Sequence, residues 1–124
     1  MKGMIYGTVL GVLTILVFGQ TEGKLGAIAR RQTRTDAAAL DAQRALVNQY
    51  CSGCHNDNNR SGGFSWTEID LGHPEKNAER SEKVIRKLRS GMMPPAGSPR
   101  PEVAALKSLA TALEMARTMA SLGR

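Results

Sequence analysis

Hydrophobic residues recur with the spacing of an α-helix in three segments that follow an apolar stretch near the N-terminus. The first segment begins at Asp36, which can cap a helix, and runs to the end of its apolar positions, which are Ala39, Leu40, Leu46, Val47 and Tyr50. The second is predicted from about Glu75 to Ser90, and the third from about Pro101 to Leu122. No strand-forming run follows the apolar stretch, so the pattern predicts an all-α fold.

The second and third predicted helices should each bury one face. In the second helix these positions are Val84, Ile85 and Leu88, and Gly91 is well placed to end the helix. In the third helix the expected buried stripe contains Val103, Leu106, Leu109, Ala110, Leu113 and Met119. Met115 is assigned to this core stripe as well, because it lies four residues before Met119.

Two segments between the helices lack helical periodicity. Residues 52–74 are rich in Gly, Asn, Asp and Ser, so we expect a loop with a short helical turn near residues 66–71. Residues 92–101 contain four prolines, which restrict the backbone to extended conformations. Such a segment can hold a side chain rigidly across a ligand without regular secondary structure.

The N-terminal segment has the composition of an export signal. Lys2 precedes an apolar run at residues 4–18, which fits either a cleaved signal peptide or a retained membrane anchor within residues 1–29. Both interpretations imply export, so we expect the protein in the periplasm or at the outer face of the cytoplasmic membrane. Residues 30–35 are predicted to be a flexible linker, and residues 36–124 have the length of one small domain, expected to be a monomer.

The chain is basic, with a formal charge of +6 that becomes +5 when Lys2, Lys24 and Glu22 are left out. This charge favours an acidic partner protein or an anionic membrane surface. The basic residues are not interleaved with aromatic residues in a nucleic-acid-binding motif, so we do not expect a nucleic-acid partner.

The strongest chemical signal is the sequence Cys51-Ser52-Gly53-Cys54-His55, which has the Cys-x-x-Cys-His spacing of a haem c attachment site. Two thiols at this spacing can reach both vinyl groups of one porphyrin edge, and the following imidazole can reach the iron. Cys51 and Cys54 are therefore the candidate thioether residues, and His55 is the candidate proximal ligand.

Two other uses of this motif remain open. A thioredoxin-like dithiol expects a strand before the cysteines, whereas a helix is predicted here. A zinc site would need four ligands, which Cys51, Cys54, His55 and His73 would have to supply.

A sixth iron ligand is expected from the proline-rich segment. Met93 is the candidate, because a residue directly before proline is held extended and its thioether suits an iron that cycles between oxidation states. Met92 is the rival, and His73 is an alternative that more simply belongs to the surface.

Other residues are candidates for the surroundings of the cofactor. Phe64 and Trp66 are expected beside the haem edge, although ordinary packing of the loop explains them equally well. Basic side chains could face the haem edge or its carboxylates, or simply face solvent, and these are Arg80, Lys83, Lys87 and Arg100.

Together these motifs resemble a class I cytochrome c domain from about Asp36 to Ala120. The shared order is helix, Cys-x-x-Cys-His, long loop, helix, Met93-Pro94-Pro95, helix. More narrowly, Cys-Ser-Gly-Cys-His-Asn and residues 87–95, Lys-Leu-Arg-Ser-Gly-Met-Met-Pro-Pro, resemble the planctomycete-type cytochrome c domain. The resemblance implies a three-helix fold around one covalent haem c, with iron ligated by His55 and Met93.

The expected function is single-electron transfer between redox partner proteins, with no catalytic residues. The alternative is that the chain is a haem electron-entry module, or a fragment, of a larger oxidoreductase, or a haem that opens its Met93 site to a small ligand.

Overall fold

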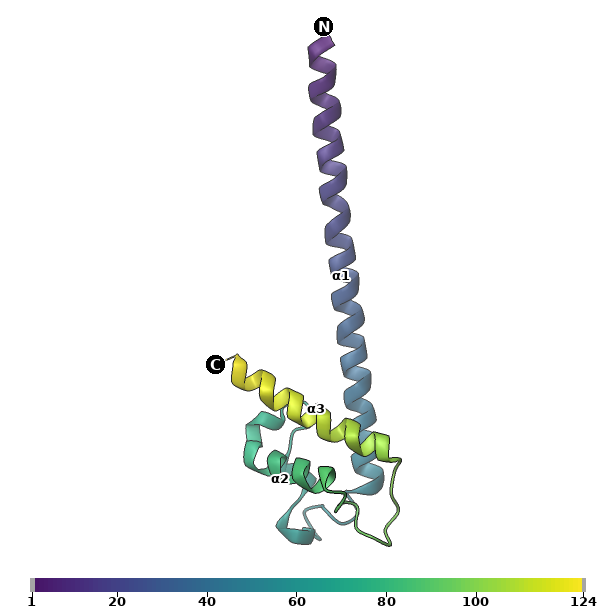
Figure 1. The fold of residues 1–124 in the computed structure, drawn as a ribbon, viewed down its shortest axis with the longest axis vertical. Coiled ribbons are helices and arrows are strands. Elements are labelled where there is room, and N and C mark those ends of the chain that lie inside the picture. Colours follow the sequence, from purple (N-terminus) through teal and green to yellow (C-terminus); the bar gives the residue numbers. More distant parts are fainter. Residues whose placement is uncertain (1, 124) are drawn as a thin grey trace. The chain divides into compact units, whose positions relative to one another are not determined.

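The computed structural model describes the backbone of residues 2–123 and the side chains of residues 24–123. Its order of elements is α1 (Lys2–Tyr50), η1 (Ser61–Gly63), η2 (Trp66–Glu68), η3 (Pro74–Asn77), α2 (Ala78–Arg89) and α3 (Val103–Leu122) (Figure 1). No strand occurs among residues 2–123, so the all-α prediction is confirmed. The chain divides into two units, Met1–Ala38 and Ala39–Arg124.

The first unit is helical, and the described side chains of residues 24–38 are all exposed. Residues 30–35, which were expected to form a flexible linker, lie within α1. Helix-favouring side chains and local hydrogen bonds explain the difference, among them Gln32 Nε2 donating to Asp36 Oδ1 at 2.8 Å. Asp36 therefore lies inside α1 and does not cap a new helix.

The apolar run at residues 4–18 lies outside the residues whose side chains the structure describes. Among the residues that were described and searched, no helix has the length and apolar character needed to span a membrane.

The second unit is built around one aliphatic core. Val47 near the end of α1 packs against α2 and α3, which lie against each other in Figure 1. The buried residues of this core are Val47, Ile85, Leu88, Leu106, Leu109, Ala110 and Leu113. Two ion pairs, Arg89 with Glu114 and Arg117 with Glu82, join the outer surfaces of α2 and α3. Because this core holds the three helices together, it positions the ends of the segments that connect them.

The third helix buries a narrower stripe than the sequence predicted. Val103, Met115 and Met119 are exposed by 64%, 62% and 67%. At 100° per residue, Met115 and Met119 point away from the face that carries Leu113. Val103 is the first residue of α3 and lies at the end of the packed face.

The boundaries of α2 follow from its capping residues. Asn77 caps the N-terminus by accepting a hydrogen bond from the Arg80 amide at 3.4 Å. At the other end, Gly91 adopts a positive φ of 68°, and the amides of Met92 and Gly91 donate to the carbonyls of Lys87 and Leu88. This is a Schellman motif, and it turns the chain out of α2 and into the proline-rich segment.

Candidate functional site

A cavity of about 550 Å³ lies within the second unit, a volume typical of small-molecule and cofactor sites. Four segments line it: the end of α1, the motif loop (defined as residues 51–66), α2, and the proline strap (defined as residues 92–101). Cys51, Cys54, His55 and Met93 all lie among the lining residues. The structure therefore brings all four candidate cofactor-binding residues to one cavity.

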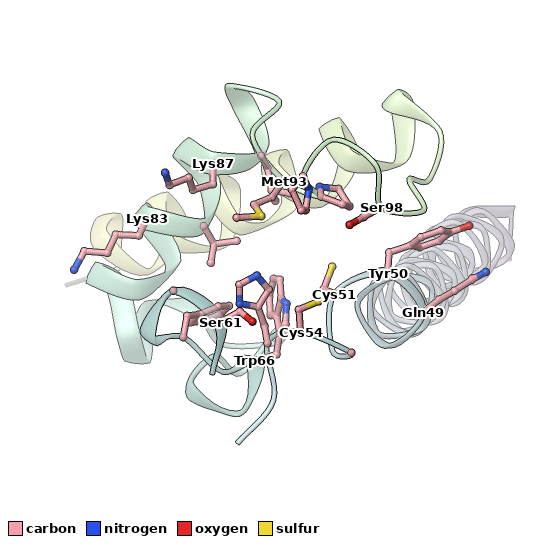
Figure 2. A pocket seen from close by; sticks show the side chains of 18 of the residues that line it. Gln49, Tyr50, Cys51, Cys54, Ser61, Trp66, Lys83, Lys87, Met93 and Ser98 are labelled. Atoms are coloured by element: carbon pink, nitrogen blue, oxygen red, sulfur yellow. The ribbon is translucent and has the colours of Figure 1, made fainter. Parts of the chain in front are cut away.

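The end of α1 positions the two cysteines. The Cys51 amide donates to the Val47 carbonyl at 2.9 Å, so the chain leaves the helix in a helical turn anchored to the core. The next turn is closed by the amides of Cys54 and His55, which donate to the Cys51 carbonyl at 3.2 and 3.0 Å. Figure 2 shows the two cysteine side chains close together on one wall of the cavity.

Asn56, the residue after the motif, organises the following loop. Its side-chain amide donates to the carbonyls of Ser52 and Gly53 at 2.8 and 3.2 Å. Its side-chain oxygen accepts from the amides of Asn58 and Asn59 at 3.0 and 2.9 Å. One side chain thus joins the cysteine turn to the loop that follows it.

His55 is held between the cysteine turn and an aromatic pair. Its carbonyl accepts from the Trp66 amide at 3.0 Å, and its ring lies 5.4 Å from that of Phe64. Phe64 in turn meets Trp66 edge to face at 5.4 Å. His55 Nδ1 and Trp66 Nε1 are buried without a hydrogen-bond partner. Such orphaned polar atoms in a cavity wall are typical of a site that takes a ligand.

Met93 reaches the cavity from the opposite side. It is half-buried and packs against the core, and Figure 2 shows it on the side of the cavity opposite Cys54 and Trp66. Met92 is 54% exposed and is absent from the cavity lining. Its sulfur accepts a hydrogen bond from Lys87 Nζ at 3.6 Å. Of the two candidate methionines, only Met93 lines the cavity.

The two thiols have different surroundings. Burial raises the pKa of Cys51 to about 11, while the indole N–H of Trp66 opposes this shift without forming a well-directed hydrogen bond. Cys54 is exposed. Cys51 is therefore protonated at neutral pH, and Cys54 is the more accessible of the two sulfur atoms.

His73 does not belong to this cavity. It is exposed, and its Nδ1 lies 3.1 Å from Glu75 Oε1. Among the residues with described side chains, no group of three or more His, Cys, Asp or Glu residues is arranged to hold a metal ion. The four ligands considered for zinc are therefore not gathered into one site.

Three of the four basic candidates line the cavity, and all three lie on α2: Arg80, Lys83 and Lys87. Arg100 is not in the lining and instead donates to the Gly91 carbonyl at 3.1 Å, which ties together the two ends of the strap. The sequence analysis missed Ser98 and Pro99 as lining residues, because nothing in a proline-rich segment indicates which side chains turn inward. Val84 and Leu88 were expected only in the core, although their helical spacing from Arg80 and Lys87 already places them on one face.

Comparisons with protein-family models, curated proteins and solved structures give no match for this chain. The residues of the cavity therefore carry the functional assignment.

The donor set fits a covalently attached haem. It combines two thiols, one imidazole and one thioether around a cavity whose remaining walls include Phe64, Val84, Leu88 and Pro94. These are the groups that hold haem c and its iron.

Proposed function

We propose that this chain is a c-type cytochrome. The observation that carries the proposal is that one cavity gathers Cys51, Cys54 and His55 with Met93, which lies 38 residues further along the chain. More specifically, the protein is a mono-haem electron carrier with His/Met ligation, similar to the planctomycete-type domain. It is exported through residues 1–29 and exchanges electrons with redox partner proteins at the outer side of the cytoplasmic membrane.

Each residue of the cavity has a distinct part in this function. Cys51 and Cys54 would hold the haem through thioether bonds, and His55 and Met93 would bind its iron. When bound, the haem supplies an iron that alternates between two oxidation states. The thioether of Met93 favours the reduced state and so raises the reduction potential. Val84, Leu88 and Pro94 keep water away from the bound group.

The two candidate iron ligands are held in ways that suit electron transfer. His55 is fixed by backbone hydrogen bonds on both sides, and Met93 is fixed by the Schellman turn on one side and Pro94 on the other. Rigid ligands change little between oxidation states, which keeps the reorganisation accompanying electron transfer small.

The test is the visible spectrum of the full chain expressed with a haem c maturation system. We expect the reduced α band of a c-type haem and, in the oxidised protein, the weak near-infrared band of methionine-to-iron ligation. Met93→Ala should lose the near-infrared band, whereas the matched control Met92→Ala should keep it. Absence of haem after competent maturation would contradict the proposal.

The same preparation separates the electron carrier from the alternative enzyme module. A six-coordinate carrier should bind cyanide slowly and only after displacement of Met93. Rapid cyanide binding by the wild type, without the near-infrared band, would instead identify an open site of the kind found in a peroxidase-like haem.

A further inference from the structure

The charges around the cavity are distributed unevenly. Three cationic side chains line it, and none of its lining residues in the described part of the chain is acidic. All three cations come from one face of α2, at the spacing of three and four residues that aligns side chains on a helix: Arg80, Lys83 and Lys87. Figure 2 shows Lys83 and Lys87 on one side of the cavity, with Cys51 and Tyr50 lying away from them.

The three cations differ in their partners. Arg80 Nε lies 2.9 Å from Glu68, and Lys83 Nζ lies 2.6 Å from Glu79. Lys87 has no carboxylate partner among the described residues, and its Nζ contacts only the thioether of Met92 at 3.6 Å. A thioether is a weak acceptor, so this contact is readily exchanged for an anion.

The arrangement also carries an electrostatic cost in the absence of an anion. Lys87 lies four positions after Lys83, and like charges at this spacing repel each other on a helix, which the Glu79 carboxylate beside Lys83 partly offsets. An anionic group placed between them would remove this repulsion and would meet two donors at once.

On the basis of the proposed function, we propose that Lys87, supported by Lys83, binds the carboxylate groups of the porphyrin. The porphyrin of haem carries its vinyl groups on one edge and its two carboxylates on the opposite edge. Cys51 and Cys54 bind the vinyl edge, so the carboxylate edge is directed away from them and toward α2. The two ends of the cavity thereby fix a single orientation of the ligand.

The test uses the full chain without cofactor and two porphyrin probes, metal-free protoporphyrin IX and its dimethyl ester. The esters lack the negative charges and keep the same ring. Trp66 lines the cavity and is the only Trp of the chain, so its fluorescence quenching reports binding. Lys87→Gln should weaken binding of the diacid by about three- to tenfold and leave the ester unchanged.

Lys107→Gln is the matched control, because Lys107 is exposed on α3 and does not line the cavity. It should leave the affinity for both probes unchanged. Equal affinity of the wild type for diacid and ester, equal losses in both lysine variants, or no porphyrin binding would overturn the assignment of Lys87.

A second measurement uses the full chain after haem c maturation and does not depend on folding without cofactor. The reduction potential is measured against pH, since it changes where the haem carboxylates titrate. Removing the Lys87 charge raises the pKa of a carboxylate that it contacts, so Lys87→Gln should move this step to higher pH. If the pH at which the reduction potential changes is the same in Lys87→Gln as in the wild type, the inference is overturned. Failure of the wild type to incorporate haem would count against the proposed function alone, because the porphyrin titration still decides the role of Lys87.

Discussion

The motif loop and the proline strap line the same cavity and both lack long helices, yet they are held in different ways. The motif loop is joined by many hydrogen bonds, four of them from the Asn56 side chain alone. In the strap, the contacts are few: Ser98 donates to the Pro95 carbonyl at 3.2 Å, and Arg100 closes its ends. The prolines and the turn at Gly91 restrict the backbone conformation of the strap further.

This difference distinguishes Cys51, Cys54 and His55 from Met93 as candidate binding residues. Cys51, Cys54 and His55 lie where local hydrogen bonds determine the backbone, so their relative positions are set before any ligand arrives. Met93 lies in a segment whose backbone is restricted mainly by the steric limits of proline. Only a few hydrogen bonds join that segment to the rest of the second unit. We therefore expect the stability of the motif loop to depend mainly on its polar side chains. The stability of the strap should depend mainly on residues that restrict the backbone, such as glycine and proline.

Asn56→Ala should give the largest effect, because it removes the four hydrogen bonds of the Asn56 side chain, which link the cysteine turn to the following loop. We expect a loss of about 2 to 3 kcal/mol in the free energy of unfolding, measured by urea denaturation of the full chain. Asn58→Ala is the control, since Asn58 is exposed and its side chain makes no hydrogen bond in the described part of the chain. Similar losses in both variants would contradict the organising role of Asn56.

Alkaline pH should weaken the motif loop through Cys51. Its pKa is raised to about 11 by burial, so the unfolded chain, with an ordinary thiol, loses this proton first. The stability of the cofactor-free chain should therefore fall as the pH rises from about 9 to 11, by at most about 2 kcal/mol, since Cys51 is only partly buried. Urea unfolding at several pH values measures this drop. The drop should be absent in Cys51→Ala, and an equal drop in that variant would assign it to other groups.

Gly91→Ala should destabilise the strap side of the cavity. Gly91 adopts a φ of 68°, where an L-residue with a Cβ is strained, although no atom lies within 4 Å of the added carbon. We expect a cost of about 1 to 2 kcal/mol by urea denaturation. Gly53→Ala serves as the comparison, because Gly53 also has open space but does not have a positive φ. A smaller loss at Gly91 than at Gly53 would refute the backbone explanation.

Arg100→Ala should have the smallest effect, because it removes one exposed hydrogen bond between the two ends of the strap. We expect about 0.5 to 1 kcal/mol, seen as faster hydrogen exchange at the Met92 and Ser98 amides. Amides of the motif loop, such as that of Trp66, should be unaffected. Arg86→Ala controls for the loss of a surface cation, and equal acceleration in that variant would remove the special role of Arg100.

The sequence predicted the helices of the second unit well because their apolar faces are regular. α2 and α3 begin and end within a few residues of the predicted positions, and Leu109, Ala110 and Leu113 are buried as expected. The assignment of Met115 and Met119 to the core failed because apolar character was counted without projecting their positions around the helix. The helical state of residues 30–35 was missed because polar residues can favour a helix without an apolar face.

The candidate site residues that are adjacent in the sequence could be predicted from the sequence. Those that are brought together only by the fold were harder to predict. The spacing of Cys51, Cys54 and His55 is visible in five consecutive residues. The sequence favoured Met93 over Met92 only through its place before Pro94, whereas in the structure Met93 lines the cavity and Met92 does not. Two further features could not be predicted because they depend on the packing of separate segments. These are the hydrogen bonds of Asn56 and the placement of all cationic lining residues on α2.

The composition of the aliphatic core has a consequence for the order of events during synthesis. Four of its seven buried residues belong to α3, the last helix among the described residues: Leu106, Leu109, Ala110 and Leu113. Until α3 has emerged, Val47 and α2 lack most of their packing partners, and the cavity has no stable frame. The cysteine motif is made some fifty residues earlier, according to its place in the sequence. Its two thiols therefore remain accessible until α3 has been made, and the packing of α3 onto the core ends this interval.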